Sequence, residues 1–290
     1  MTKFDASWSA LLSPQNSDLL FDFDPLPERN FTTPVFDLSV AWWMAALCHT
    51  SYLEPSDTED LRDKNRNTEL GRQDFLELYS FDQGAIQGML VDCGKVYVLA
   101  FRGTDTLKDW TTNLQVQQSP WPGGGLAHKG FVQAFNDIAQ ELIKQRGVFR
   151  DKPWIITGHS LGAALAILSS QIIGPLGIYC FGCPRLGDTA FVDSFSNQRI
   201  YQIIHNRDLV STIPADFGEW EFKKPGTKYL LEGKQIIANP DESELTAGTL
   251  DLSLALDRLS KIHKWKDPVQ DVSDHAIINY LAALELNLAK

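Results

Sequence analysis

The segment that decides the fold is WIITGHSLGAALAILSS, residues Trp154–Ser170. Its first four residues are apolar enough for a buried strand, and Leu161–Ile173 has the length and the small, apolar composition of a packed helix. Ser160 lies at the junction, with a glycine two residues before it and another two residues after it. This Gly-x-Ser-x-Gly pattern is typical of a nucleophile on a strained strand-to-helix turn, where the glycines let neighbouring segments approach closely. A structural glycine turn is the alternative reading of the pentapeptide alone.

The sequence around this segment alternates between strand and helix patterns. An apolar helix is predicted over Val35–Tyr52, a polar loop over Ser56–Arg72, and a final helix over Ser273–Leu288. Apolar strands that alternate with helices favour an α/β fold with a central, mostly parallel sheet covered by helices on both faces. The other elements predicted are strands at Phe75–Ser80, Ala85–Val91, Lys95–Phe101, Gly177–Phe181 and Ile200–His205, and a helix at Phe131–Arg146.

The length and composition favour one domain. A chain of 290 residues with 43% hydrophobic content can bury about three-quarters of its unfolded surface in a single core. Residues 1–35 are rich in proline and phenylalanine, and we expect them to form an irregular arm that packs on the body. The prediction is therefore a single domain over residues 1–290.

The charge and the absence of long apolar runs restrict partners and location. The net charge of −11 argues against nucleic acid as a partner. No stretch approaches the ~20 apolar residues of a membrane span, and the first residues lack a secretory signal pattern. The expectation is a cytoplasmic protein, or one exported without a recognisable signal peptide.

The four cysteines do not form a metal-site pattern. Cys180 and Cys183 make a C-x-x-C, but no second pair lies at zinc-ligand spacing. We expect buried thiols, with a single disulfide left open, and neither a metal nor an organic cofactor.

A serine nucleophile needs a base, and the base needs an orienting acid. In hydrolases with this elbow, the acid and the histidine follow the serine along the chain. Asp208 comes just after the last apolar strand, whereas Asp188 follows a turn and Asp193 lies on a predicted helix. After Asp208 only His263 and His275 remain, and the position of His275 at the start of the last helix favours it.

The reaction also needs donors for the oxyanion. One donor is the backbone N–H after the nucleophile, here Leu161, and the other comes from a loop after an earlier strand. The strand Lys95–Phe101 ends in Arg102-Gly103-Thr104, which makes Thr104 the candidate for the second donor.

The chain resembles the class 3 lipases, the filamentous-fungal type of lipase. The resemblance extends from about Ser39 to Tyr280 and rests on seven motifs in the family's order: AFRGT (100–104), DWTTNL (109–114), HKGF (128–131), TGHSLGAALA (157–166), FGCPRLGD (181–188), HNRDLVSTIP (205–214) and DHAIINY (274–280). It implies an α/β-hydrolase fold, Ser160 as nucleophile, Asp208 as acid, His275 as base, and oxyanion donors at Thr104 and Leu161.

The same resemblance implies an ester lipid as substrate, most simply an acylglycerol met at a lipid–water interface. The expected activity is that of a triacylglycerol lipase, a serine ester hydrolase. Phospholipase A1 and feruloyl-type esterase activities are the alternatives on the same scaffold, followed by a non-catalytic lipid-binding or signalling relative. Fungal members are typically secreted and disulfide-bonded. This chain shows no signal pattern, and its four cysteines do not suggest such disulfides, so it is expected to belong to a bacterial or intracellular branch.

A short lid helix is expected just after the oxyanion loop. Leu107, Trp110 and Leu114 fall on one helical stripe, which would suit closure over the site in water. Three consecutive glycines follow at 123–125 and could act as a hinge. Residues 105–125 are therefore predicted to form the lid and its hinge.

Overall fold

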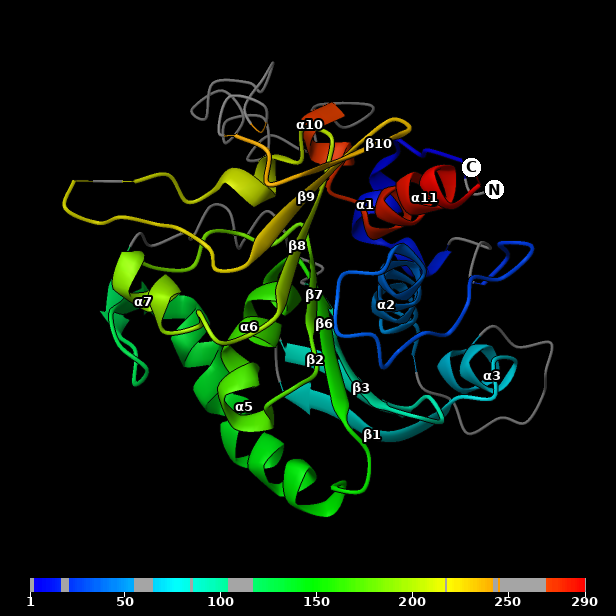
Figure 1. The fold of residues 1–290 in the computed structure, drawn as a ribbon, viewed down its shortest axis with the longest axis horizontal. Helices are drawn as coiled ribbons and strands as arrows, with labels where there is room; N and C mark the ends of the chain where they lie inside the picture. Colours follow the sequence, from blue (N-terminus) through cyan, green and yellow to red (C-terminus); the bar gives the residue numbers. More distant parts are fainter. Residues whose placement is uncertain are drawn as a thin grey trace.

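A mostly parallel sheet forms the centre of the protein (Figure 1). The computed structural model describes residues 3–16, 21–54, 65–83, 86–103, 117–216, 218–241, 245 and 270–289. In this part of the chain the main sheet has eight strands, in the order β1-β2-β3-β6-β7-β8-β9-β10. Their bounds are β1 Leu76–Gln83, β2 Ile86–Asp92, β3 Tyr97–Phe101, β6 Trp154–His159, β7 Ile178–Phe181, β8 Ile200–His205, β9 Thr227–Glu232 and β10 Gln235–Ala238.

The strands that carry the site are parallel and buried. β3, β6, β7, β8 and β9 pair in parallel, whereas β1, β2 and β10 add antiparallel edges. Every residue of β3, β6, β7 and β8 is buried. Continuous apolar runs suit such strands, because both faces of the sheet are covered. The predicted α/β fold with a mostly parallel sheet is confirmed.

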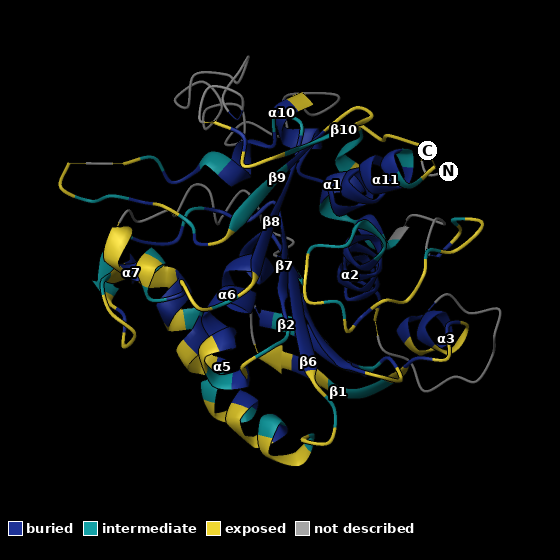
Figure 2. Cartoon of the chain, in the orientation of Figure 1, coloured by how far each residue is buried: buried dark blue, intermediate teal, exposed yellow. Residues whose placement is uncertain are grey.

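Helices cover both faces of this sheet (Figure 1). One face carries α5 (Lys129–Val148), α6 (Leu161–Ile173) and α7 (Thr189–Asp193), and the other carries α2 (Leu38–Thr50) and α11 (Ile277–Leu288). Figure 2 shows that α2, α6 and α11 are buried almost all round, whereas α5 exposes one side to solvent. The smaller elements are α1 Trp8–Leu12, η1 Pro14–Asn16, α3 Arg66–Gly71, η2 Leu209–Thr212 and α10 Gln270–Ser273, with a ribbon of β4 Gln118–Pro120 and β5 Leu126–His128.

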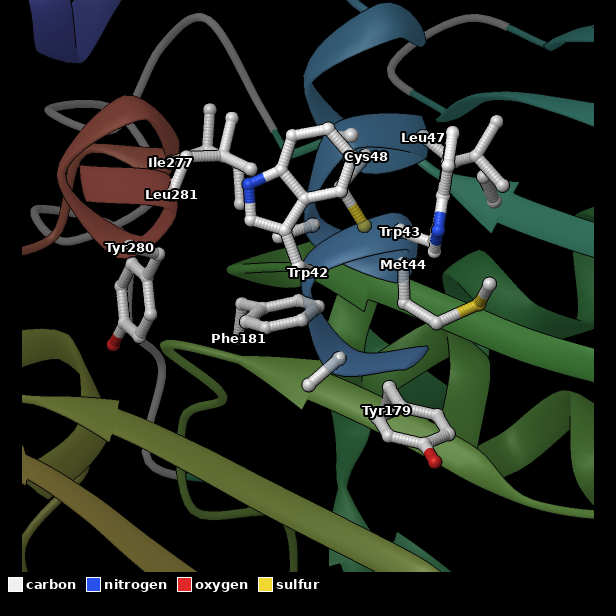
Figure 3. Packing of buried hydrophobic residues seen from close by; sticks show 14 of the residues in the cluster. Trp42, Trp43, Met44, Leu47, Cys48, Tyr179, Phe181, Ile277, Tyr280 and Leu281 are labelled. Atoms are coloured by element: carbon white, nitrogen blue, oxygen red, sulfur yellow. The ribbon is translucent and has the colours of Figure 1, made fainter. Parts of the chain in front are cut away.

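Aromatic packing fixes α11 against the sheet. Figure 3 shows Trp42 of α2 facing Ile277 and Leu281 of α11, with Phe181 of β7 close by. The rings of Phe181 and Tyr280 meet edge-on, with 5.8 Å between their centroids. This contact holds Tyr280 at the C-terminal end of β7, where its hydroxyl reaches the site described below.

The structure differs from the sequence predictions at three places. The polar segment predicted as a loop contains α3, and the hairpin of β9 and β10 was not predicted. The predicted last helix, Ser273–Leu288, begins as α11 only at Ile277, and His275 lies between it and the short helix α10. Ala276 has an extended backbone (ψ 130°), and the Asn279 side chain donates to the Ser273 carbonyl (2.8 Å), which ends α10.

The first residues of the chain pack on the body. Asp5 N–H donates to Asn279 Oδ1 (2.8 Å), and Ala10 and Leu11 of α1 join the same core as α2 and α11. All four cysteines are buried free thiols. Among the described residues, no helix combines the length and the apolar composition that crossing a bilayer requires. That the whole chain is one domain stays a prediction.

Candidate active site

Ser160 lies on a strained turn between β6 and α6. Its backbone has φ 57° and ψ −125°, a combination that residues other than glycine rarely adopt. Ser160 N–H donates to the Phe181 carbonyl of the neighbouring strand (2.9 Å), which holds the turn in place. Ser160 is also the N-cap residue of α6, where a serine hydroxyl normally accepts a helix N–H, but here Oγ makes no capping bond. The hydroxyl is therefore not committed to holding the helix.

The two flanking glycines are needed for close packing. A Cβ at residue 158 would collide with the main chain of Gly162 and Ala163. A Cβ at residue 162 would lie 2.5 Å from the Phe101 carbonyl oxygen and 2.6 Å from that of Arg102. The strand that leads to Gly103 thus runs directly against the start of α6. This is the geometric reason for the Gly-x-Ser-x-Gly pattern.

Asp208 and His275 form a buried hydrogen-bonded pair. His275 Nδ1 lies 2.8 Å from Asp208 Oδ2, and both side chains are buried. Asp208 Oδ1 accepts the N–H of Val210 at the start of η2 (2.8 Å), which fixes the carboxylate. Burial alone would raise the pKa of Asp208, but the nearby His275 and the hydrogen bonds from His275 and Tyr280 hold the pKa below its ordinary value. The carboxylate is therefore ionised at neutral pH.

This pair fixes the tautomer of the histidine. An ionised carboxylate only accepts, so His275 Nδ1 carries the proton and Nε2 is the basic nitrogen of the neutral ring. His275 Nε2 and Ser160 Oγ are both buried and, in the described part of the chain, make no hydrogen bond, including to each other. Contacts between a catalytic base and nucleophile are often longer before substrate binds.

Gly182 brings the serine and the pair together. The Phe181 carbonyl binds Ser160, and the next residue, Gly182, lies directly against the pair with φ +58°. A Cβ at Gly182 would lie 2.6 Å from Asp208 Oδ2 and 2.7 Å from His275 Nδ1. This glycine lies within the motif FGCPRLGD, and no role for it was predicted from the sequence.

Tyr280 is a further site residue that sequence reasoning missed. Its hydroxyl donates to Asp208 Oδ2 (2.6 Å), so this oxygen accepts from both His275 and Tyr280. The motif DHAIINY includes Tyr280, but only the fold shows that the five-residue spacing from His275 returns the phenol to the acid.

The structure brings Ser160, Asp208 and His275 together and leaves the rival acids elsewhere. Asp188 caps α7, where its Oδ1 accepts the N–H of Phe191 (2.7 Å), and Asp193 is the last residue of that helix. Leu161 is the first residue of α6, and the first N–H groups of a helix lack acceptors within it. The predicted residues Thr104, Leu107, Trp110 and Leu114, and the rival His263, lie outside the described residues.

The later part of the predicted lid and hinge is packed on the body. β4 pairs with β5, and Trp121 packs against Phe135, Phe191 and Phe195. A Cβ at Gly125 would collide with the main chain of Phe191. Residues 117–128 therefore form a ribbon that packs on the body in this structure, and the lid and hinge over residues 105–125 stay a prediction.

A cavity of 490 Å³ lies beyond η2, on the side of the acid. Its described lining includes neither Ser160 nor His275. Lys224 lines it and donates to the carbonyls of Cys183 and Ser211, both at 2.9 Å, and burial lowers the pKa of Lys224 to about 8. The lining residues are Arg185, Val192, Ser211, Thr212, Asp216, Phe222, Lys223, Lys224, Lys228 and Leu245.

Comparisons with known proteins show what this chain is similar to. A family model described as Lipase (class 3) matches residues 98–218. This segment, which contains the nucleophile turn and Asp208, is therefore similar to the class 3 lipases. Among curated relatives, the toxin TseL of Vibrio cholerae is 36% identical over 99 residues, covering 32% of this chain and 15% of TseL. A lipase of Rhizomucor miehei is 29% identical over 158 residues, covering 48% of this chain and 43% of the lipase.

The chain spans less than half the length of each of these two relatives. The solved structure of Rhizomucor miehei triacylglyceride lipase has a TM-score of 0.60 at 19% identity, covering 74% of this chain and 90% of that one, which shows the same fold. The matched segment 98–218 contains Ser160 and Asp208 but ends before His275. The position of His275 therefore rests on the geometry of the site.

Proposed function

We propose that this chain is a serine carboxylic-ester hydrolase that acts on acylglycerols, with Ser160 as nucleophile, His275 as base and Asp208 as the orienting acid. The observation that carries the proposal is the buried Asp208–His275 pair, which leaves His275 Nε2 as a basic nitrogen, together with a Ser160 hydroxyl on a strained turn that makes no capping hydrogen bond. A structural role for the pentapeptide does not require a buried, hydrogen-bonded aspartate–histidine pair.

The proposed reaction starts with proton transfer from Ser160 Oγ to His275 Nε2. The serine oxygen attacks the ester carbonyl, and Asp208 holds the imidazolium that forms. His275 then returns the proton to the leaving alcohol, which leaves an acyl-enzyme on Ser160. Water repeats the sequence, with His275 as base, and releases the carboxylic acid.

The start of α6 supports the negative charge that develops on the carbonyl oxygen. The Leu161 N–H is the proposed donor on this side, and the 13-residue helix points its positive end at the same place. Thr104 is the proposed second donor. Removing one such donor costs about 3 kcal/mol in the barrier of a serine hydrolase.

The experiment that tests the proposal is hydrolysis of p-nitrophenyl esters from acetate to palmitate. Wild type should turn over at least one ester, and Ser160→Ala should lower kcat by about 10⁵-fold or more. Asp188→Asn changes a carboxylate that lies outside the triad and should keep wild-type kinetics. Equal activity of Ser160→Ala and wild type would refute the assignment.

A phospholipid is the second candidate substrate. Ser211 of η2, three residues after Asp208, lines the 490 Å³ cavity, and Lys224 places a half-buried cation in its wall. A cation in this position favours a substrate with an anionic headgroup. Lys224→Met should then reduce hydrolysis of phosphatidylglycerol while leaving dibutyrin hydrolysis unchanged, whereas equal loss on both would remove this candidate.

We further propose that the partner is lipid, not nucleic acid, and that the protein acts in the cytoplasm. The net charge of −11 and the four free, buried thiols support these two points.

A further inference from the structure

Tyr52 and His159 connect three parts of the site through one series of hydrogen bonds. Gly103 N–H donates to Tyr52 Oη (3.1 Å), and Tyr52 Oη lies 2.9 Å from His159 Nδ1. His159 Nε2 lies 2.7 Å from the main-chain oxygen of His275. All of these side chains are buried. The series runs from the residue before Thr104, past the nucleophile turn, to the histidine.

The chemistry of the end groups sets one direction for the series. The His275 carbonyl only accepts, so His159 Nε2 must carry a proton. The neutral ring then has a bare Nδ1, which accepts the Tyr52 hydroxyl proton, and Tyr52 Oη accepts from Gly103 N–H. Burial, followed by the nearby His275, lowers the pKa of His159 to about 3, so the ring stays neutral at working pH. This is the only arrangement of protons in which every donor of the series has an acceptor.

The contacts along the series leave little freedom. A Cβ at Gly103 would collide with Tyr52 Oη and lie 3.1 Å from His159 Nδ1. The rings of His159 and His275 lie 4.6 Å apart, centroid to centroid. His159 is also the residue before Ser160, so its ring position and the nucleophile turn depend on each other.

We propose that Tyr52 and His159 are positioning residues that set the distance between Gly103, which follows β3, and the catalytic imidazole. The inference rests on the proposed function and deepens it. Tyr52 holds Gly103, the residue before the proposed donor Thr104, while His159 holds the backbone of His275. If the side chains at positions 52 and 159 only filled space, apolar residues would be sufficient. Polar groups at buried positions are a disadvantage unless they are paired, because an unpaired buried polar group costs free energy. A fully paired network instead fixes one geometry.

The test compares Tyr52→Phe with a matched control, Tyr97→Phe. Tyr97 lies at the other end of β3, and its hydroxyl donates a 2.7 Å hydrogen bond to Asp151, far from the turn. Tyr52→Phe should lower kcat by about 10- to 100-fold, the effect of a small displacement of catalytic groups. KM should change by less than about twofold, because ground-state binding is kept. The Ki of an alkyl boronic acid, which forms a tetrahedral adduct on Ser160, should rise by the same factor as kcat falls.

A role in stability alone predicts a different result. Both tyrosine variants would then lose a similar amount of thermal stability, and neither would change kcat or the boronic acid Ki by more than about twofold. That outcome overturns the proposal while Ser160-dependent ester hydrolysis persists, so it is distinct from failure of the proposed function. No ester hydrolysis by wild type would instead refute the proposed function.

Substitution of His159 gives a second test that does not depend on the folding of Tyr52→Phe. His159→Gln keeps an amide donor for the His275 carbonyl and an acceptor for Tyr52, whereas His159→Leu keeps neither. Glutamine should retain about tenfold more kcat than leucine, the effect of one hydrogen bond. Equal kcat in the two variants contradicts the proposal.

Discussion

Asp274 allows a quantitative prediction of pH-dependent stability. Its carboxylate is fully buried and accepts two long hydrogen bonds, from the Arg207 N–H (3.3 Å) and from Asn206 Nδ2 (3.4 Å). Burial is the main cause that raises the pKa of Asp274 to about 7, and the charges of Asp208 and Asp271 add to it. In the unfolded chain the pKa of an aspartate is about 3.9. Asp274→Asn replaces the acid with a neutral group of the same shape.

The sign of the effect follows from proton linkage. Between about pH 4 and pH 7 the folded chain holds this proton and the unfolded chain does not. The contribution of Asp274 to the free energy of unfolding therefore falls as pH rises through this window. With pKa values of about 7 and 3.9, the fall between pH 5 and pH 8 is about 2.5 kcal/mol. An asparagine side chain cannot ionise, so the Asp274→Asn variant should lack this fall.

Guanidinium unfolding at pH 5 and pH 8 measures the effect. The free energy of unfolding of Asp274→Asn, relative to that of wild type, should rise by about 2.5 kcal/mol from pH 5 to pH 8, because all other titrations cancel in the comparison. Asp188→Asn, which changes a helix-capping carboxylate, should show the same change in the free energy of unfolding between the two pH values as wild type. If Asp274→Asn also runs parallel to wild type, within about 0.5 kcal/mol, the carboxylate is not held neutral by burial and the reasoning is wrong.

Three further predictions concern the site. Tyr280→Phe should lower kcat on p-nitrophenyl butyrate about tenfold, because Asp208 loses a charge-assisted hydrogen bond; a fall below twofold would contradict this. Gly182→Ala should reduce both activity and stability, the latter by about 1–2 kcal/mol, since a Cβ would press on Asp208 and His275 at positive φ; unchanged unfolding and kinetics would show that the contact relaxes freely. If Trp110 belongs to a lid, Trp110→Ala should reduce the rise in activity when substrate passes from monomer to emulsion, and an identical rise would refute the lid.

The sequence predicted the sheet well because its central strands are buried on both faces. Such strands are continuous apolar runs, and the runs at Trp154–Thr157 and Ile200–His205 match β6 and β8 within two residues. The hairpin of β9 and β10 was missed because its residues are mostly half-exposed at a sheet edge, without a strong apolar signal. The break at His275 was missed because it depends on Asn279, whose side chain takes the Ser273 carbonyl.

The nucleophile turn was predictable from a local pattern, since its glycines and serine lie within five residues. The supporting residues were not, because they come from distant parts of the chain. Tyr280 is 72 residues from Asp208, and Tyr52 is 107 residues from His159. No spacing rule connects such pairs before the fold is known. The role of Gly182 was missed for a similar reason, because its small size matters only where Asp208 and His275 pack on it.

The most direct test of the central claim is to locate the adduct of a fluorophosphonate probe by peptide mass spectrometry. One adduct per chain is expected, on the peptide that contains Ser160, and it should be absent from Ser160→Ala and form far more slowly in His275→Ala. Labelling at another residue, or ester turnover by wild type with no adduct on Ser160, would contradict the assignment of Ser160 as the nucleophile.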